Sequence, residues 1–181
     1  MKIRGNKVVI RPKKPSDVEN DYLWQTDPEL SALDAMEPST MPFREFYREY
    51  IGWLKHPNTN RITFGIDTPD GKHIGNCVYY NIDEDKQETE IGIMIGNFNY
   101  WNKGYGVDTI STLIDYIFRD RKFNRVYLKT LETNLHAQKC FQKCGLTSCG
   151  FKEKEGYKFL LMEMTYSQWR ELKNQGKLAS F

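Results

Sequence analysis

The chain has 181 residues, of which 39% are hydrophobic and 14% aromatic, so it can bury a substantial core and is not a disordered chain. Its 26 basic and 24 acidic side chains leave a formal charge of +2, which argues against a protein that holds nucleic acid through phosphate contacts. No stretch approaches the roughly 20 apolar residues needed to cross a bilayer, and the first residues lack the apolar segment of a signal peptide, so we expect one cytosolic domain over residues 1–181.

The first part of the chain predicts one strand and two helices. Residues 7–12, KVVIRP, form a short strand pattern. Ser16 or Asp17 can cap a helix, and residues 43–54 place apolar side chains at helical spacing. The apolar residues of the first helix are Val18, Tyr22 and Leu23. The segment between the two helices, residues 27–42, has two prolines near its end and is predicted as a loop.

Three strand patterns follow, over residues 60–67, 73–83 and 88–96. The TPDG sequence at residues 68–71 has the proline and glycine chemistry of a tight turn, so the first two strands are expected to form a hairpin. A short polar stretch connects the second strand to the third. We therefore expect three consecutive antiparallel strands in the middle of the chain.

The last part returns to alternating elements. Apolar spacing predicts a helix over residues 107–118, and residues 125–133 form a β-branched and aromatic strand. Asn134 is a good helix N-cap, and the helix it starts would run to Cys144. Residues 147–165 predict two closing strands. The complete order is strand, two helices, three strands, helix, strand, helix and two strands, which predicts a mixed α/β fold.

The cysteines allow two interpretations. His136, Cys140 and Cys144 are spaced four residues apart and Cys149 follows, which is compatible with a zinc site. The same helix carries an apolar stripe that includes Phe141, and a reduced cysteine behaves as a small hydrophobic residue. We favour the core interpretation and expect no metal.

A glycine-rich segment, NYWNKGYGVDT at residues 99–109, precedes the helix that begins near Val107. Glycines ahead of a helix N-terminus allow an anion to approach backbone N–H groups, and the helix dipole favours negative charge there. Lys103 precedes Gly104 instead of following the glycines, which excludes a Walker loop, and Thr109 stands where a dinucleotide loop has its third glycine. The segment therefore predicts a phosphate site of another kind, with a plain glycine-rich turn as the alternative.

Two motifs resemble those of the GNAT superfamily of acyl-CoA-dependent N-acetyltransferases. WNKGYG at residues 101–106 is similar to its [QR]-x-x-G-x-[GA] signature, with Trp101 in the Gln or Arg place. NLHAQKCFQKCGL at residues 134–146 is similar to its second motif. Trp101 and the EIG sequence at 90–92 resemble the branch of ribosomal-protein N-terminal acetyltransferases, although Asn102 departs from that branch's glycine. The resemblance spans almost the whole chain and implies a central, mostly antiparallel twisted sheet flanked by helices.

The resemblance also implies a site for acetyl-CoA. Backbone amides of residues 102–107 would hold the pyrophosphate, the strand backbone at 93–95 would pair with the pantetheine arm, and Asn134 would lie near that arm in addition to capping its helix. Lys103 would contact phosphate or remain in solvent. The implied coenzyme residues are Ile93, Met94, Ile95, Trp101, Asn102, Lys103, Gly104, Tyr105, Gly106, Val107 and Asn134.

The resemblance places a catalytic carboxylate at Glu90, which would take the proton of the acceptor amine directly or through water; a purely structural carboxylate is the alternative. Asp34 and Glu37 can instead recognise the acceptor. Phe141 stands where many family members have a tyrosine acid, and phenylalanine has no proton to donate. The remaining candidates to donate a proton to the leaving thiolate are Tyr105, Tyr127 and water. Without an acid, catalysis would depend mainly on positioning.

The leading hypothesis is an N-acetyltransferase that acts on a protein N-terminus or a small amine. The acidic run at residues 83–90 is compatible with a polycationic acceptor, such as a polyamine or an aminoglycoside, but we favour its interpretation as a solvated turn. A non-catalytic module that binds or senses CoA is an alternative that Phe141 keeps open. We expect the protein to bind an amine acceptor and to bind neither nucleic acid nor a membrane. For the oligomeric state, we consider a homodimer as well as a monomer.

Overall fold

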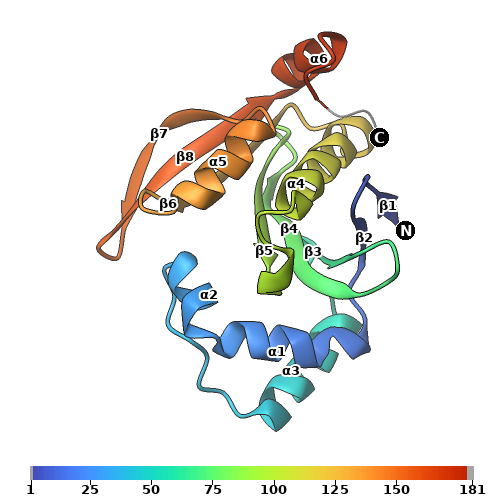
Figure 1. The fold of residues 1–181 in the computed structure, drawn as a ribbon, viewed down its shortest axis with the longest axis vertical. Coiled ribbons are helices and arrows are strands. Elements are labelled where there is room, and N and C mark those ends of the chain that lie inside the picture. The colour runs from blue at the N-terminus through green and yellow to red at the C-terminus, as the bar shows by residue number, and fades with distance from the viewer. Residues whose placement is uncertain (1, 179–181) are drawn as a thin grey trace.

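The computed structural model describes residues 2–178, and the strands in that range form one sheet in the order β1-β2-β3-β4-β5-β6-β8-β7 (Figure 1). The strands are β1 (Ile3–Arg4), β2 (Val9–Pro12), β3 (Arg61–Asp67), β4 (His73–Asp83), β5 (Glu88–Ile95), β6 (Arg125–Leu131), β7 (Thr147–Lys154) and β8 (Tyr157–Thr165). Neighbouring strands are antiparallel except β5 and β6, which are parallel.

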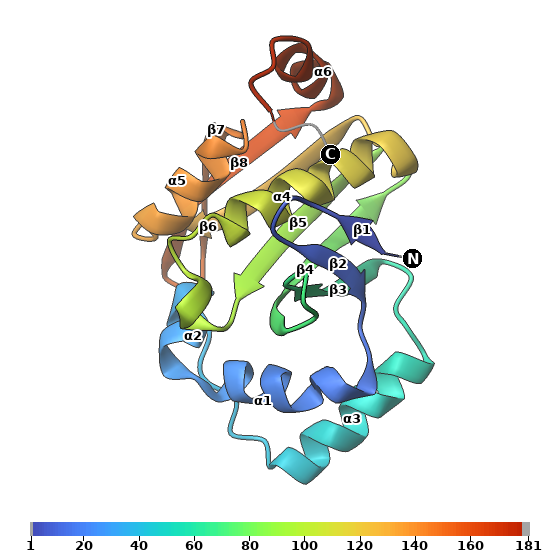
Figure 2. The same ribbon diagram turned by 45° about the vertical axis from the view of Figure 1, so that its right-hand side comes forward.

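Helices connect and cover this sheet. They are α1 (Val18–Thr26), α2 (Pro28–Leu33), α3 (Phe43–Lys55), α4 (Tyr105–Tyr116), α5 (Leu135–Lys143) and α6 (Tyr166–Asn174), with short 3-10 turns η1 (Pro15–Asp17) and η2 (Phe98–Tyr100) and a π-helical end of α4, η3 (Ile117–Arg121). Figure 2 shows α4 crossing in front of β5, while α1 and α3 lie together at the far end of the molecule. No helix within residues 2–178 is long and apolar enough to span a membrane.

The predicted mixed α/β arrangement is confirmed, but residues 27–42 are not all loop. Asp27 caps α2 by accepting hydrogen bonds from the N–H groups of Glu29 and Leu30, both at 2.9 Å. Pro28 occupies the first helical position, where its fixed φ angle fits and no N–H is needed. The helix has six residues, too few to show apolar periodicity, and it is marked in the sequence only by its capping residues.

The first helix, α1, is present but its predicted details were partly wrong. Asp17 stands at the N-cap position without capping through its side chain, because its carboxylate is bound to the Arg11 guanidinium at 2.6 and 2.8 Å. Leu23 is 61% exposed, whereas Trp24 beside it is buried. The buried side of α1 therefore includes an aromatic residue that the predicted stripe did not contain.

Two elements at the ends of the chain were missed. The short strand β1 pairs with β2 through Ile3 and Arg4. Helix α6 follows β8, and Thr165 and Gln168 form a capping box at its start. Trp169 of α6 is buried and its indole N–H donates to Asp115 at 2.7 Å, so this helix packs against the end of α4.

The two faces of the central strands have different partners. Side chains alternate along a strand, so successive residues of β4 point to opposite faces. Tyr79 points toward α4, where its ring lies 6.3 Å from that of Tyr116. Tyr80 points to the opposite face, where it lines a cavity. The core thus lies between the sheet and α4, and the other face of β4 and β5 is left to form the floor of the candidate site.

The parallel strands β5 and β6 separate soon after they meet. They are in register only from Glu88 with Arg125 to Glu90 with Tyr127. Strand β5 then continues to Ile95 along β4, while β6 continues to Leu131 along β8. Beyond Glu90, these two strands therefore have facing edges that are not paired with one another, and the sheet is open along this line.

Candidate active site

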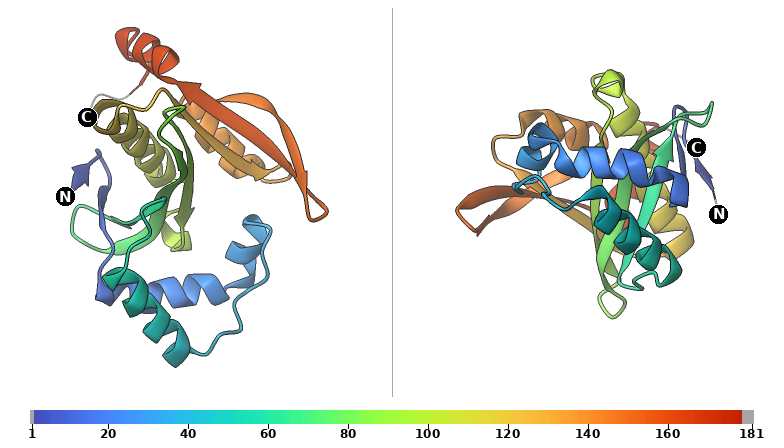
Figure 3. Two further views of the ribbon diagram at one scale, coloured as in Figure 1. Left: turned by 180° about the vertical axis from the view of Figure 1, so that it is seen from behind. Right: turned by 90° about the horizontal axis from the view of Figure 1, so that it is seen from below.

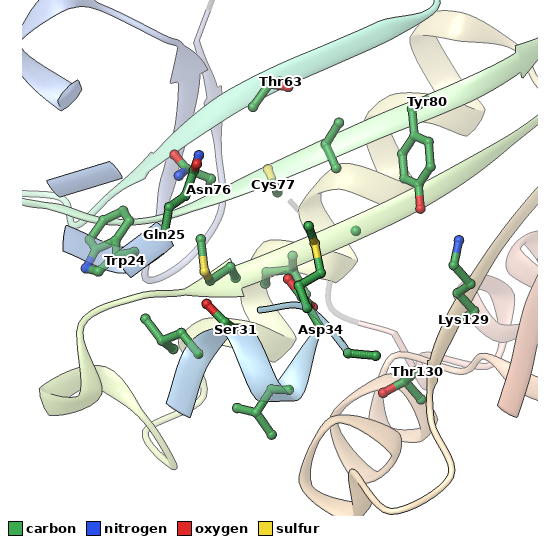
Figure 4. Close-up of a pocket in the computed structure, with 18 of the residues that line it drawn as sticks. Trp24, Gln25, Ser31, Asp34, Thr63, Asn76, Cys77, Tyr80, Lys129 and Thr130 are labelled. Carbon is green, nitrogen blue, oxygen red and sulfur yellow. The ribbon is translucent and has the colours of Figure 1, made fainter. Parts of the chain in front are cut away.

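A cavity of about 980 Å³ lies at the opening between β5 and β6 (Figure 4). Its walls come from the N-terminal helices, the strands β3 to β6, the start of α5 and the β7–β8 hairpin. Figure 3 shows the hairpin extending from the sheet on the same side as α2. Lining side chains include Trp24, Asp34, Tyr80, Met94, Lys129, Asn134, Phe141 and Tyr157.

Several predicted coenzyme residues meet at this opening. Ile93 and Met94 line the cavity from β5, and Asn134 lines it from the start of α5. Asn134 is also the expected N-cap, since its Oδ1 accepts from the N–H of Ala137 at 3.1 Å. Ile95 lies at the end of β5, where its carbonyl oxygen accepts from the indole Nε1 of Trp101 at 2.6 Å. Trp101 thus fixes the end of β5 against the glycine-rich loop.

Glu90 lies at the point where the strands part, and its carboxylate is held by three donors. Tyr80 Oη donates to Oε1 at 2.6 Å, and Lys129 Nζ lies 2.7 Å from the same oxygen. Asn81 Nδ2 donates to Oε2 at 2.9 Å. Glu90 is 5% exposed and is not among the residues that line the cavity, whereas Tyr80 and Lys129 both are. Figure 4 shows Lys129 extending toward the hydroxyl end of Tyr80.

These contacts define the charge of Glu90. Burial acts to raise the pKa of the Glu90 carboxyl, but the hydrogen bonds from Lys129 and Tyr80 outweigh it and hold this pKa below its ordinary value. Burial and the same hydrogen bond raise the pKa of the Tyr80 hydroxyl. Glu90 is therefore a carboxylate at neutral pH, and it reaches the cavity through the Tyr80 hydroxyl and the Lys129 ammonium.

Asp34 is the second carboxyl group of the site, and it is differently placed. It caps the end of α2 through its backbone and lines the cavity, as Figure 4 shows, with no hydrogen bond to its carboxylate from the described residues 2–178. The Asp34 side chain remains exposed to solvent on one side. The cavity walls around it raise the pKa of its carboxyl above the ordinary value, and the positive charge of Lys129 acts to lower that pKa. An unpartnered carboxylate in a recess is suited to binding a cation.

The glycine-rich loop leads directly into α4. Gly104 is the N-cap residue with φ of 84°, a left-handed conformation that favours glycine. The N–H of Asp108 bonds to the carbonyl of Gly104 at 3.0 Å, so the N–H groups of residues 105–107 precede the first backbone bond of the helix. A Cβ at Gly106 would lie 3.3 Å from Cys140 Sγ, so this glycine also permits close packing of α4 on α5. The Lys103 ammonium donates to the carbonyl of Asn99 at 2.8 Å.

Of the remaining residues predicted for the site, some line the cavity and others do not. None of residues 101–107 lines the cavity, so the glycine-rich loop lies outside the cavity wall. Glu37 lines the cavity beside Asp34. Phe141 is buried at the cavity wall, while the alternative donors Tyr105 and Tyr127 are not part of that wall. Sequence reasoning missed Lys129, which no local motif marks.

The cysteines on the apolar face of α5 belong to the packed core. Cys144 is 1% exposed, and Cys140 packs against the same core cluster. His136 instead stacks on Trp101, with ring centroids 5.6 Å apart, and its Nε2 lies 2.8 Å from Asn102 Oδ1. Among residues 2–178 there is no group of three or more His, Cys, Asp or Glu side chains that is arranged to hold a metal ion.

The arrangement fits a long ligand with an anionic end and an amide-bearing arm. Free N–H groups at residues 105–107 suit an anion. The separated edges of β5 and β6 suit an arm that adds backbone-type hydrogen bonds to a strand. The cavity beyond Asn134 gives a reacting group at the end of such an arm access to a second molecule.

Comparison with known proteins agrees with this geometry. A family model described as an acetyltransferase (GNAT) domain matches residues 7–147. A Bacillus licheniformis protein named "uncharacterized N-acetyltransferase p20" is 26% identical over 172 residues, which cover 89% of this chain and 96% of that protein.

Solved structures share the fold at lower sequence identity. The spermidine N-acetyltransferase from Vibrio cholerae, solved with CoA and spermine, is similar with a TM-score of 0.79 and 18% identity over 91% of this chain and 98% of that one. An aminoglycoside acetyltransferase solved with coenzyme A is similar with a TM-score of 0.77 and 16% identity over 92% of this chain and 99% of that one. The predicted fold, with its mostly antiparallel sheet, is confirmed.

Proposed function

The chain belongs to the GNAT acetyltransferase family and is an acyl-CoA-dependent N-acetyltransferase; we propose that it transfers the acetyl group of acetyl-CoA to a primary amine bound in the cavity. The observation that carries this proposal is the separation of β5 and β6 at Glu90, directly beside the cavity that Ile93, Met94 and Asn134 line. A thioester held in this opening faces an amine that enters from the cavity. Acetyl-CoA supplies an activated acyl group whose carbonyl carbon the amine attacks.

The coenzyme contacts remain those predicted from the resemblance. The loop of residues 102–107 holds the diphosphate through its backbone N–H groups, and the backbone at 93–95 pairs with the pantetheine arm. The supporting features are the glycine conformation at Gly104 and the free strand edge beyond Glu90. Asn134 caps α5 and lies close enough to the opening to bond the arm.

For the proton, we propose a relay from the amine through Tyr80 to Glu90. As the amine nitrogen forms its bond to the carbonyl carbon, it releases a proton to the Tyr80 oxygen, and the Tyr80 hydroxyl passes its own proton to Glu90. The 2.6 Å bond between Tyr80 Oη and Glu90 Oε1 supports this path, as does the position of Tyr80 in the cavity wall. Lys129 keeps Glu90 ionised between turnovers.

The leaving thiolate has no tyrosine acid at position 141, because Phe141 occupies that place in the wall. Water, which the cavity admits, is the proton source that we propose. The product CoA thiol has a lower pKa than an alcohol, so a strong acid is not required, and the rate then depends chiefly on holding amine and thioester together.

Among acceptors, a small polycation is a second, more specific candidate. The carboxylates of Asp34, Glu37 and Glu49 line the same cavity, so a molecule with two or more ammonium groups finds more than one partner there. The similar Vibrio cholerae and aminoglycoside enzymes are named for acceptors of this kind. The acidic run at residues 83–90 does not contribute to this argument, since Asp83 pairs with Lys86 at the surface and Glu88 pairs with Arg125.

A protein N-terminus remains the alternative acceptor, as the resemblance to ribosomal-protein N-terminal acetyltransferases predicts. The cytosolic location and the homodimer also remain predictions. A dimer through the edge strand β7, which is exposed along most of its length, would be seen as a doubled mass in sedimentation.

The proposal is tested by following release of the CoA thiol from acetyl-CoA in the presence of spermidine, an aminoglycoside and short peptides with free N-termini. Release that requires one class of amine and saturates with it supports acetyl transfer and identifies the acceptor. Binding of acetyl-CoA with no release for any amine would instead support a non-catalytic module that binds CoA.

A further inference from the structure

The segment before β2 is tied to the first turn of α4 by a buried carboxylate. Asp108 is 7% exposed, and its side chain accepts backbone N–H bonds from Asn6 at 3.1 Å, Lys7 at 2.7 Å and Val8 at 3.0 Å. Three bonds from consecutive residues to one carboxylate fix the backbone of the segment against the helix. The position of Lys7 relative to α4 is therefore defined by the fold, although its side chain is exposed.

The Lys7 side chain crosses the start of α4 at the glycine loop. Its ammonium donates to the carbonyl of Lys103 at 3.0 Å and lies 5.7 Å from the centre of the Tyr105 ring. At Gly104, the position that a Cβ would occupy lies 3.7 Å from Lys7 Cε and 3.9 Å from Lys7 Nζ. The ammonium is thus within reach of any ligand that contacts the N–H groups of residues 105–107.

This placement is electrostatically unfavourable unless an anion is present. The N-terminus of a helix carries partial positive charge, so cations are normally found at the other end. Two ammonium groups, those of Lys7 and Lys103, stand at this end of α4, and neither forms an ion pair with a carboxylate of residues 2–178. Asp108, the acid in the first turn of α4, has its oxygens directed to the backbone of the N-terminal segment.

We propose that Lys7 binds a phosphate group of the coenzyme, and that Asp108 positions Lys7 for this contact. The proposal rests on the acetyl-CoA site described above and extends that site to the N-terminal segment, about 100 residues away in sequence. In this arrangement the backbone N–H groups of the loop contact the phosphate from the helix side, and the Lys7 ammonium supplies the positive charge from the other side.

The test compares ligands with and without phosphate. CoA and pantetheine are titrated calorimetrically against the wild-type chain, Lys7→Met, Lys7→Arg and the control Lys2→Met, which removes the same charge from an exposed lysine of the same segment. Lys7→Met keeps the alkyl stem, so its melting temperature without ligand should match that of the wild type. We expect Lys7→Met to bind CoA about tenfold more weakly, to bind pantetheine as the wild type does, and to be rescued by Lys7→Arg.

The outcomes separate this inference from the function on which it rests. Unchanged CoA affinity in Lys7→Met, or an equal loss for CoA and pantetheine, would overturn the assignment of Lys7 and leave the acetyltransferase proposal standing. A wild-type chain that binds no CoA would overturn the proposed coenzyme site together with the role of Lys7. An equal loss in Lys2→Met would show a general charge effect and would also overturn the assignment.

Discussion

Lys129 Nζ lies 2.7 Å from Glu90 Oε1 and joins β6 to β5 just beyond the last residue pair at which these strands are in register. The ion pair is partly exposed on the Lys129 side and buried on the Glu90 side, at 35% and 6%. It closes the narrow end of the opening and keeps a negative charge beside Tyr80. The contact therefore connects the geometry of the split sheet to the proton path of the proposed reaction.

The relay predicts how Glu90 and Tyr80 respond to substitution. Glu90→Gln keeps the shape but removes the proton acceptor, so kcat should fall by about 10²-fold or more at neutral pH. Tyr80→Phe should cause a similar loss because the path passes through its hydroxyl. The double variant should be no slower than the worse single variant, since both changes interrupt one path. Losses that multiply in the double variant would contradict the relay, as would turnover near the wild-type value for Glu90→Gln across the pH range.

Lys129 should set the pH at which Glu90 loses its proton-accepting form. Lys129 holds the pKa of Glu90 down, so Lys129→Met should raise that pKa. Activity requires the carboxylate form, and the acidic limb of kcat against pH should therefore move to higher pH in the variant. Lys86→Met is a control that removes an exposed lysine from the β4–β5 turn. An acidic limb that stays in place for Lys129→Met would show that Glu90 is not the titrating group.

The Asp34 carboxylate should contribute to binding of the acceptor amine and not to binding of the coenzyme. Asp34→Asn removes the unpartnered carboxylate, so we expect KM for a cationic amine to rise about tenfold, with the CoA dissociation constant unchanged. Burial raises the pKa of Asp34, so in the wild type the amine should lose affinity on acidification at a higher pH than for an ordinary aspartate. Asp85→Asn, on the exposed β4–β5 turn, is the matched control. Equal KM values for Asp34→Asn and Asp85→Asn would exclude Asp34 as an amine ligand.

Substitution of Gly104 tests whether the glycine-rich loop binds the coenzyme, as proposed. Gly104→Ala places a side chain at φ of 84°, which should cost about 1–2 kcal/mol in the free energy of unfolding, and its methyl group lies where a phosphate would approach. Gly71→Ala is the control, because Gly71 has φ of 90° with open space around it and no proposed ligand. Both variants should lose stability, and only Gly104→Ala should show a reduced thermal shift with acetyl-CoA. Identical shifts would show that the loop has only a structural role.

Asp17 should make stability depend on pH. Its carboxylate is 1% exposed and paired with Arg11, which is 5% exposed. Burial raises its pKa, but the Arg11 hydrogen bonds outweigh this and keep the pKa of Asp17 below its ordinary value. The pairing therefore contributes stability above the ordinary pKa of about 3.9, and that contribution is lost as the pH falls through the lower native value.

Urea denaturation of Asp17→Asn measures this contribution. Breaking a buried pair leaves Arg11 without one partner, so the free energy of unfolding at pH 7 should fall by about 3 kcal/mol. The difference from the wild type should narrow as the pH falls below the ordinary aspartate pKa of about 3.9, where the unfolded chain binds a proton at Asp17, and should be smallest once the native carboxyl is protonated as well. A difference that is the same at neutral and acidic pH would show that the loss comes from packing and not from charge.

Local chemistry made much of the fold predictable. The hairpin at 68–71, the capping by Asn134 and the glycine at the start of α4 each depend on residues close together in the sequence, and all three are found in the structure. Helix α2 was missed because it is short and is marked only by Asp27 and Pro28. Periodicity is a weak guide to a helix of one or two turns.

The site was less predictable because its contacts join distant segments. Lys129 and Glu90 are 39 residues apart, and Lys7 and Asp108 are 101 apart. No spacing rule relates such pairs, since the sheet topology brings them together. The sequence motifs led to the proposed coenzyme loop and to the carboxylate of Glu90, whereas the residues that contact them, Lys129 and Lys7, were found only in the three-dimensional arrangement.

In the proposed reaction, the coenzyme arm passes between β5 and β6 and the thioester meets the amine in the cavity. A crystal structure of the chain with bound CoA tests this most directly. We predict that the diphosphate lies at residues 102–107, that the arm bonds to the free edge of β5 beyond Glu90, and that the thiol sulfur lies in the cavity near Tyr80 and Asp34. Density for CoA elsewhere on the surface, or a thiol that ends outside the cavity, would contradict the proposed coenzyme site.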